Sequence, residues 1–171
     1  DKIRAAHSRF PALHDVVVEV DGDWRRPPYR RRGVSRLVVP GLQLMLPQLA
    51  SFTSITSLSL RRQGLVSFPA SLCALTGLKK LNLNGNKIVA LPDAIGDLKE
   101  LTHLHVGGNQ LTALPDTLGA LTGLTELWAY SNKLATLPDS IAALAALENL
   151  NLYRNKFTTL PKPIVKLTSL T

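Results

Sequence analysis

The stretch Leu101–Gly123 reads LTHLHVGGNQLTALPDTLGALTG, and the chain repeats variants of it in succession. Four copies are each 23 residues long: Leu78–Glu100, Leu101–Gly123, Leu124–Ala146 and Leu147–Ser169. A looser copy of the same length, Ile55–Gly77, precedes them. A fixed period of roughly 20 to 50 residues indicates a repeat architecture, in which each unit buries its apolar face against its neighbours.

The stacked copies share the pattern Leu-x-x-Leu-x-Leu-x-x-Asn-x-Leu-x-x-Leu-Pro-x-x-Ile-x-x-Leu-x-x. Its first half alternates apolar and polar residues with a period of two, which predicts a short strand. The pattern resembles the leucine-rich repeat family, in particular its 23-residue intracellular type with a Leu-Pro pair in each unit. The resemblance covers Ile55–Ser169 and implies an α/β solenoid. It would be a right-handed superhelix with a concave parallel sheet and short helical or 3₁₀ turns on the convex side.

One amide side chain stands at the same place in every copy: Gln63, Asn86, Asn109, Asn132 and Asn155. An amide offers both donors and an acceptor. We therefore expect a buried amide ladder that satisfies the backbone where the chain turns out of the sheet.

The second half of each regular copy carries the chain back towards the next strand. Three copies have a proline followed by an aspartate, in the pairs Pro92-Asp93, Pro115-Asp116 and Pro138-Asp139. Aspartate is a favoured N-cap residue, so we expect these carboxylates to cap single helical or 3₁₀ turns. Three leucines that follow should point into the core: Leu98, Leu121 and Leu144.

Residues 1–54 do not show the repeat plainly. Strand-like spacing begins at Leu13 and at Val34, which favours two degenerate repeats acting as an N-terminal cap. The alternative is a separate small cap built on a hairpin at Val16–Val20. Residues 55–171 hold the five 23-residue units and, at Leu170-Thr171, the start of another. Eight strand starts would give a sheet roughly 34 Å long, which suits a protein or peptide better than a metabolite.

The composition bounds the remaining possibilities. With 171 residues, 45% of them hydrophobic, the chain can form one domain with a sizeable core. No apolar run approaches the length of a membrane span. Because Cys73 is the only cysteine, no intramolecular disulfide can form, and it should be a packed apolar residue. We therefore expect a reducing, intracellular setting: the cytoplasm, or a host cytoplasm for a secreted effector.

Candidate binding residues lie between and just after the strand leucines, where side chains should point away from the core onto the concave face. Trp128, Tyr130 and Tyr153 should cluster there beside a shallow notch at Gly85, Gly107 and Gly108. Aromatic residues and arginine dominate binding hot spots, because they bury large rigid areas and keep polar tips. The predicted binding set is Arg61, Asn82, Asn84, His103, His105, Glu126, Trp128, Tyr130, Asn151, Tyr153 and Arg154.

These residues predict that the chain is a protein–protein recognition module. We expect it to be a monomeric fragment of a larger intracellular signalling or effector protein. The chain has neither a nucleophile-elbow motif nor a phosphate-binding glycine loop, so we expect no enzyme activity and no cofactor. His103, His105 and Glu126 could form a zinc or iron site, although we expect no metal.

The alternative function is binding to nucleic acid or an anionic surface. The chain carries a formal net charge of +8. A basic segment concentrates part of it, in Arg25, Arg26, Arg30, Arg31 and Arg32. A single aromatic, Tyr29, accompanies these arginines, so we expect nucleic acid binding to be the weaker candidate.

Overall fold

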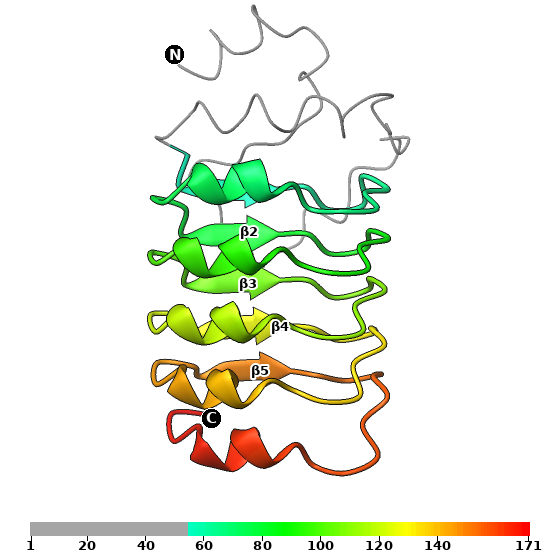
Figure 1. Ribbon diagram of the computed structural model, residues 1–171, viewed down its shortest axis with the longest axis vertical. Coiled ribbons are helices and arrows are strands. Elements are labelled where there is room, and N and C mark those ends of the chain that lie inside the picture. Colours follow the sequence, from blue (N-terminus) through cyan, green and yellow to red (C-terminus); the bar gives the residue numbers. More distant parts are fainter. Residues whose placement is uncertain (1–54) are drawn as a thin grey trace, which may run out of the picture.

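The structure is a computed structural model that describes residues 55–171, in which short strands alternate with short 3₁₀ helices (Figure 1). The strands are β1 (Ser57–Ser59), β2 (Lys80–Asn82), β3 (His103–His105), β4 (Glu126–Trp128) and β5 (Asn149–Asn151). The helices are η2 (Ala70–Ala74), η3 (Asp93–Asp97), η4 (Asp116–Ala120), η5 (Asp139–Ala143) and η6 (Lys162–Lys166). The predicted N-terminal cap, 1–54, lies outside the described residues.

The strands form one parallel sheet in the order β1-β2-β3-β4-β5. Its register follows the repeat, because Leu81 pairs with Leu104 and Leu104 with Leu127, which hold the same position in successive copies. The 3₁₀ helices stack in the same order along the other side of the solenoid (Figure 1). The predicted solenoid of parallel strands and 3₁₀ turns is confirmed.

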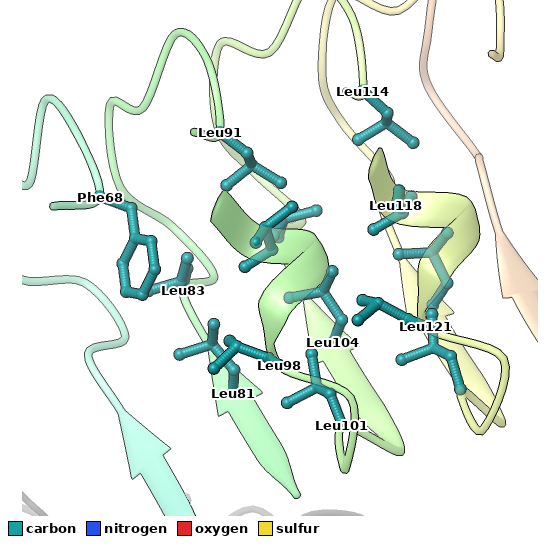
Figure 2. Packing of buried hydrophobic residues seen from close by; sticks show 14 of the residues in the cluster. Phe68, Leu81, Leu83, Leu91, Leu98, Leu101, Leu104, Leu114, Leu118 and Leu121 are labelled. Atoms are coloured by element: carbon teal, nitrogen blue, oxygen red, sulfur yellow. The ribbon is translucent and has the colours of Figure 1, made fainter. Parts of the chain in front are cut away.

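Leucines from strands and helices meet in one continuous core between these two layers (Figure 2). Leu81 and Leu104 from the strands, and Leu98 and Leu121 from the return segments, are at most 1% exposed. Burying one leucine stabilises a fold by roughly 1.5 to 3 kcal/mol, and each repeat contributes several. The predicted inward orientation of Leu98, Leu121 and Leu144 is confirmed.

The amide ladder is confirmed for the four asparagines, whereas Gln63 is half-buried and its Nε2 donates within its own loop, to the carbonyl of Arg61 (3.2 Å). Asn109 donates from Nδ2 to the carbonyl of Leu83 in the preceding rung (3.0 Å) and to that of Val106 in its own (2.9 Å). Its Oδ1 accepts from the backbone N–H of Ile88 (3.1 Å). Each asparagine thus joins two rungs through backbone groups that would otherwise lie buried without partners, which is costly.

The predicted aspartate caps are wrong. Each of these three 3₁₀ helices has proline at its N-cap, and no side chain there accepts a capping hydrogen bond. The proline carbonyl itself accepts the first bond, from Ile95 to Pro92 in η3 (3.0 Å). Because the proline already stands at the cap, Asp93 becomes the first residue of the helix.

Small residues let neighbouring 3₁₀ helices approach closely. A Cβ added to Gly96 would lie 2.6 Å from the carbonyl oxygen of Thr117, and one added to Gly119 would meet the carbonyl of Ser140. Ala142 and Cys73 occupy the same repeat position. Cys73 is buried, as predicted, and burial, assisted by Asp97, raises its thiol pKa to about 11.

Candidate protein-binding surface

The side chains that leave the strands opposite the leucine core form one surface, here called the sheet face, which is the concave face of the prediction. Its positions are the first and third residues of each strand and the residue two further on, because side chains two apart share a face. They fall into three classes of exposure within the predicted set. The buried residues are Asn82, Asn84, His105 and Glu126. The half-buried residues are Arg61, His103, Trp128 and Tyr130. The exposed residues are Asn151, Tyr153 and Arg154, of which Arg154 lies in the adjoining loop.

The asparagines of this set accept hydrogen bonds from backbone N–H groups. Asn84 Oδ1 accepts from the N–H of Gly107 on the next rung (2.6 Å). Asn82 Oδ1 accepts from the N–H of Asn84 (3.0 Å), and Asn151 makes the same contact with Tyr153 (3.1 Å). We therefore correct the prediction that Asn82 and Asn84 are free to contact a partner, because both are buried and bonded within the fold.

A buried carboxylate joins the two histidines. Glu126 lies on β4 beside β3, with Oε2 at 3.4 Å from His103 Nε2 and Oε1 at 3.7 Å from His105 Nε2. Thr102, which the predicted set omits, donates its hydroxyl to the carbonyl of Lys79 (3.0 Å). Its oxygen lies 2.9 Å from His103 Nδ1, and can only accept there because its hydrogen is already used. Thr102 precedes the strand, and a threonine at that position does not indicate a binding site in the sequence, so sequence reasoning missed it.

The imidazole of His105 is stacked inside this surface. Its ring lies 4.0 Å from the ring of Trp128, with an interplanar angle of 4°. Burial lowers the pKa of His105 to about 4, and the nearby His103 and Lys80 charges act in the same direction. His105 is therefore neutral at physiological pH and stacks on Trp128, and of the two side chains only Trp128 is partly exposed.

The predicted notch is filled by Tyr130. A Cβ on Gly107 would lie 2.6 Å from Cζ of Tyr130 and 2.7 Å from Cδ1, so the tyrosine ring rests directly on the glycine backbone. The Arg62 side chain similarly approaches Gly85, within 2.9 Å of where its Cβ would be. Glycine thus serves here to admit a neighbouring side chain, and the predicted notch for a partner is wrong.

Tyr153 is the most accessible member of the aromatic group. It is 68% exposed, and the Arg154 guanidinium lies 5.3 Å from the centre of its ring. The backbone N–H of Ser131, next to Tyr130, donates to the Tyr153 carbonyl (2.7 Å), so the two tyrosines occupy adjacent rungs. Trp128 precedes Tyr130 by two positions on the same face. Together the three form what is here called the aromatic patch, at the β4–β5 end of the sheet face.

The loop after each strand passes through the left-handed backbone region. The residues concerned share one repeat position, with φ between 51° and 73°: Arg62, Gly85, Gly108, Ser131 and Arg154. Glycine adopts this conformation freely, whereas other L-residues do so at a cost. The structure thus repeats one loop geometry whether or not glycine is present.

Comparison with known proteins agrees with this geometry. The family described as Leucine rich repeat matches residues 53–111, and a second model of that description matches residues 146–167. A leucine-rich repeat protein of Leptospira interrogans is 37% identical over 72% of this chain and 31% of its own, with a TM-score of 0.71. This chain is a leucine-rich repeat protein.

Two further structures have the same fold. The ectodomain of a plant membrane receptor kinase from Arabidopsis thaliana, solved in complex with Casparian strip integrity factor 2, is 34% identical. The match covers 72% of this chain and 16% of that one, with a TM-score of 0.67. Internalin C2 of Listeria monocytogenes is 27% identical over 72% of this chain and 53% of its own, with a TM-score of 0.65. This leucine-rich repeat chain therefore spans only part of each relative.

No curated protein sequence matches the chain. Leucine-rich repeat domains are in general protein-binding modules and are typically non-catalytic, and no catalytic family was found. In the part of the chain that the structure describes, no group of three or more His, Cys, Asp or Glu residues could hold a metal ion. Among the same residues, no helix has the length and apolarity needed to cross a bilayer. The basic segment Arg25–Arg32 lies outside the described residues.

Proposed function

We propose that this leucine-rich repeat chain binds a protein or peptide on its sheet face, with the aromatic patch as the anchor. The observation that supports this is the exposure of Tyr153 beside two half-buried aromatics. The other central side chains of this face bond to the backbone or contact one another within the fold. Asn84, His105 and Glu126 make contacts within the fold. They therefore hold the surface in shape, and the partner would contact the aromatic residues.

The chemistry of the patch suits a partner that supplies a flat or apolar group. Trp128 and Tyr130 are held in place, Trp128 by the His105 ring and Tyr130 by the backbone of Gly107. Anchors that are rigid before binding lose little conformational entropy when the complex forms. Arg154 adds a cation next to Tyr153, which extends the patch to a carboxylate on the partner.

The wider setting is part of the same proposal. We propose a target-selection or scaffold role within a larger intracellular signalling or effector protein, on the family resemblance and on the single buried thiol of Cys73. The receptor ectodomain from Arabidopsis was solved with a bound factor, which supports a polypeptide partner here as well.

The test compares two exposed residues on opposite sides of the same repeat. Tyr153 on the sheet face and Val165 on η6 are 68% and 73% exposed, so truncating either should leave the fold intact. A partner would be isolated with the full chain and its affinity measured by calorimetry. We expect Tyr153→Ala to weaken binding at least tenfold, and Val165→Ala to change it by less than twofold. Equal effects of the two substitutions would exclude the sheet face as the binding site.

A further inference from the structure

The loops that follow the strands stack along one side of the solenoid, beyond the arrowheads in Figure 1, and are here called the loop edge. It comprises residues 61–66, 84–89, 107–112, 130–135 and 153–158, and the first residue of each range also belongs to the sheet face, where the two surfaces meet. Every Asp and Glu of 55–171 lies elsewhere, whereas the loop edge carries six cations: Arg61, Arg62, Lys87, Lys133, Arg154 and Lys156. The loop edge is therefore purely basic, whereas the other five cations of 55–171 lie on the parts of the repeats that also carry the carboxylates.

The three lysines occupy one repeat position, directly after the ladder asparagine. Lys87, Lys133 and Lys156 each donate their backbone N–H to a carbonyl of the preceding rung, at 2.7 to 2.8 Å, and Gln110 does the same between them. Four consecutive rungs thus present these side chains in line, about 5 Å apart. All three lysines are exposed.

Four of the six cations have no carboxylate partner among the described residues. Within 55–171, Lys87, Lys133, Lys156 and Arg154 form no ion pair, and Lys133 Nζ instead bonds to Gln110 Oε1 (3.2 Å). Lys133 and Lys156 are one rung apart, about 5 Å, and Lys87 lies two rungs from Lys133, about 10 Å. These like charges repel one another, and an anion placed along the row would relieve the repulsion. The loop edge is thus prepared for a negatively charged partner.

The apolar residues of the edge indicate the class of that partner. Val66 and Val89 are 60% and 52% exposed on neighbouring rungs, and Tyr153 is 68% exposed at the opposite end. A nucleic acid backbone has nothing to place on two valines, whereas a polypeptide offers carboxylates and apolar side chains together. The run from Lys87 to Lys156 spans three rung spacings, or about 14 Å, which four or five extended residues would cover.

We propose that the loop edge docks an acidic, extended segment of the protein partner, with Lys87, Lys133 and Lys156 contacting its carboxylates. This inference rests on the proposed function, since the segment would lie beside the aromatic patch through Tyr153 and Arg154. It assigns charge recognition to the loop edge and apolar anchoring to the sheet face.

The test uses the full chain and a fluorescein-labelled twelve-residue peptide of Glu and Ser with one central Phe. Fluorescence anisotropy at physiological salt gives its affinity. We expect the triple variant Lys87→Gln, Lys133→Gln, Lys156→Gln to weaken binding at least tenfold. A matched triple variant removes three exposed lysines outside the loop edge, Lys99→Gln, Lys162→Gln and Lys166→Gln. It should change affinity by less than twofold.

Three outcomes would overturn the inference. The first is equal weakening of peptide binding by both triple variants, and the second is equal affinity for a peptide with Gln in place of Glu. The third is tighter binding to a twelve-base-pair DNA duplex, provided that the loop-edge variant abolishes this binding. The last would identify a nucleic acid track instead. Circular dichroism of each variant establishes that it is folded. If the loop-edge variant leaves partner binding unchanged while Tyr153→Ala weakens it, the proposed function stands and this inference alone fails.

Discussion

The repeats Leu124–Ala146 and Leu147–Ser169 have nearly the same sequence pattern but different surroundings. Leu127 is fully buried, whereas its counterpart Leu150 is only partly so, and Leu137 is 8% exposed against 70% for Leu160. In the described structure the first repeat has a rung on each side, and the second has one on a single side. A repeat position therefore specifies where a side chain points, and its neighbours decide how far it is buried.

The same comparison holds on the sheet face. His105, Trp128 and Asn151 share one column of the sheet, yet they are buried, half-buried and exposed in turn. The proposed aromatic patch lies at the β4–β5 end, where Trp128 is half-buried and Tyr153 is exposed. Substitutions at paired positions can now test how far this difference in surroundings controls stability.

The largest expected effect is at the paired leucines. Leu127→Ala should lower the free energy of unfolding by about 4 kcal/mol, because it leaves a cavity enclosed on both sides. Leu150→Ala should cost about 1 to 2 kcal/mol, since part of that side chain is already in water. Urea unfolding followed by circular dichroism measures both. Equal costs would show that the last repeat is as well covered as the central one.

The ladder asparagines should follow the same order. Asn132→Ala removes bonds to the backbone of Leu111, Val106 and Ala129, all buried, and should cost about 3 kcal/mol. Asn155→Ala should cost about 1 kcal/mol, because Asn155 is half-buried and water can replace it. The check is the difference between their urea midpoints. A larger loss for Asn155→Ala would contradict the comparison.

A smaller effect concerns pH. The pKa of His105 is lowered to about 4 in the fold, so the unfolded chain binds the proton first as pH falls from about 6.5. The stability contributed by neutral His105 is complete above about pH 6.5 and lost progressively down to about pH 4. The change should be about 2 to 3 kcal/mol.

Thermal or urea unfolding from pH 7 to pH 4 tests this dependence. His105→Gln should flatten the profile in that window. Asn151→His places the same side chain at the exposed counterpart and should add no comparable slope, because an exposed imidazole keeps its ordinary pKa. A profile that His105→Gln leaves unchanged would assign the pH dependence to other groups.

The smallest effect should be independent of the surroundings. Ser131 and Arg154 have φ values of 51° and 54°, where Gly108 stands at the equivalent position with 64°. Ser131→Gly and Arg154→Gly should each raise the free energy of unfolding by about 0.5 kcal/mol. Glycine relieves the backbone strain in the fold, and this gain exceeds the loss that comes from the greater entropy of the unfolded chain. Differential scanning calorimetry can resolve this. Destabilisation by both would show that the loop stores no strain there.

Periodicity was sufficient to predict the solenoid, the strand register and the asparagine ladder. Leu81, Leu104 and Leu127 hold the same position in three successive repeats, because a leucine must fill the same volume in each rung. The aspartate caps were mispredicted because Pro92 and Asp93 are both compatible with a helix start, and only the backbone path selects between them. The predicted site residues share one face but differ in exposure, and their role in binding stays a prediction.

The sequence by itself determined which residues repeat and hence which face the core, since a constant period must place identical positions in register. Only the tertiary structure decided that Tyr130 lies over Gly107, that Trp128 stacks on His105, and that Glu126 is buried beside His103 and His105. These contacts join side chains on adjacent rungs. Their geometry depends on rotamers and on packing against the neighbouring rung, neither of which a repeat pattern encodes.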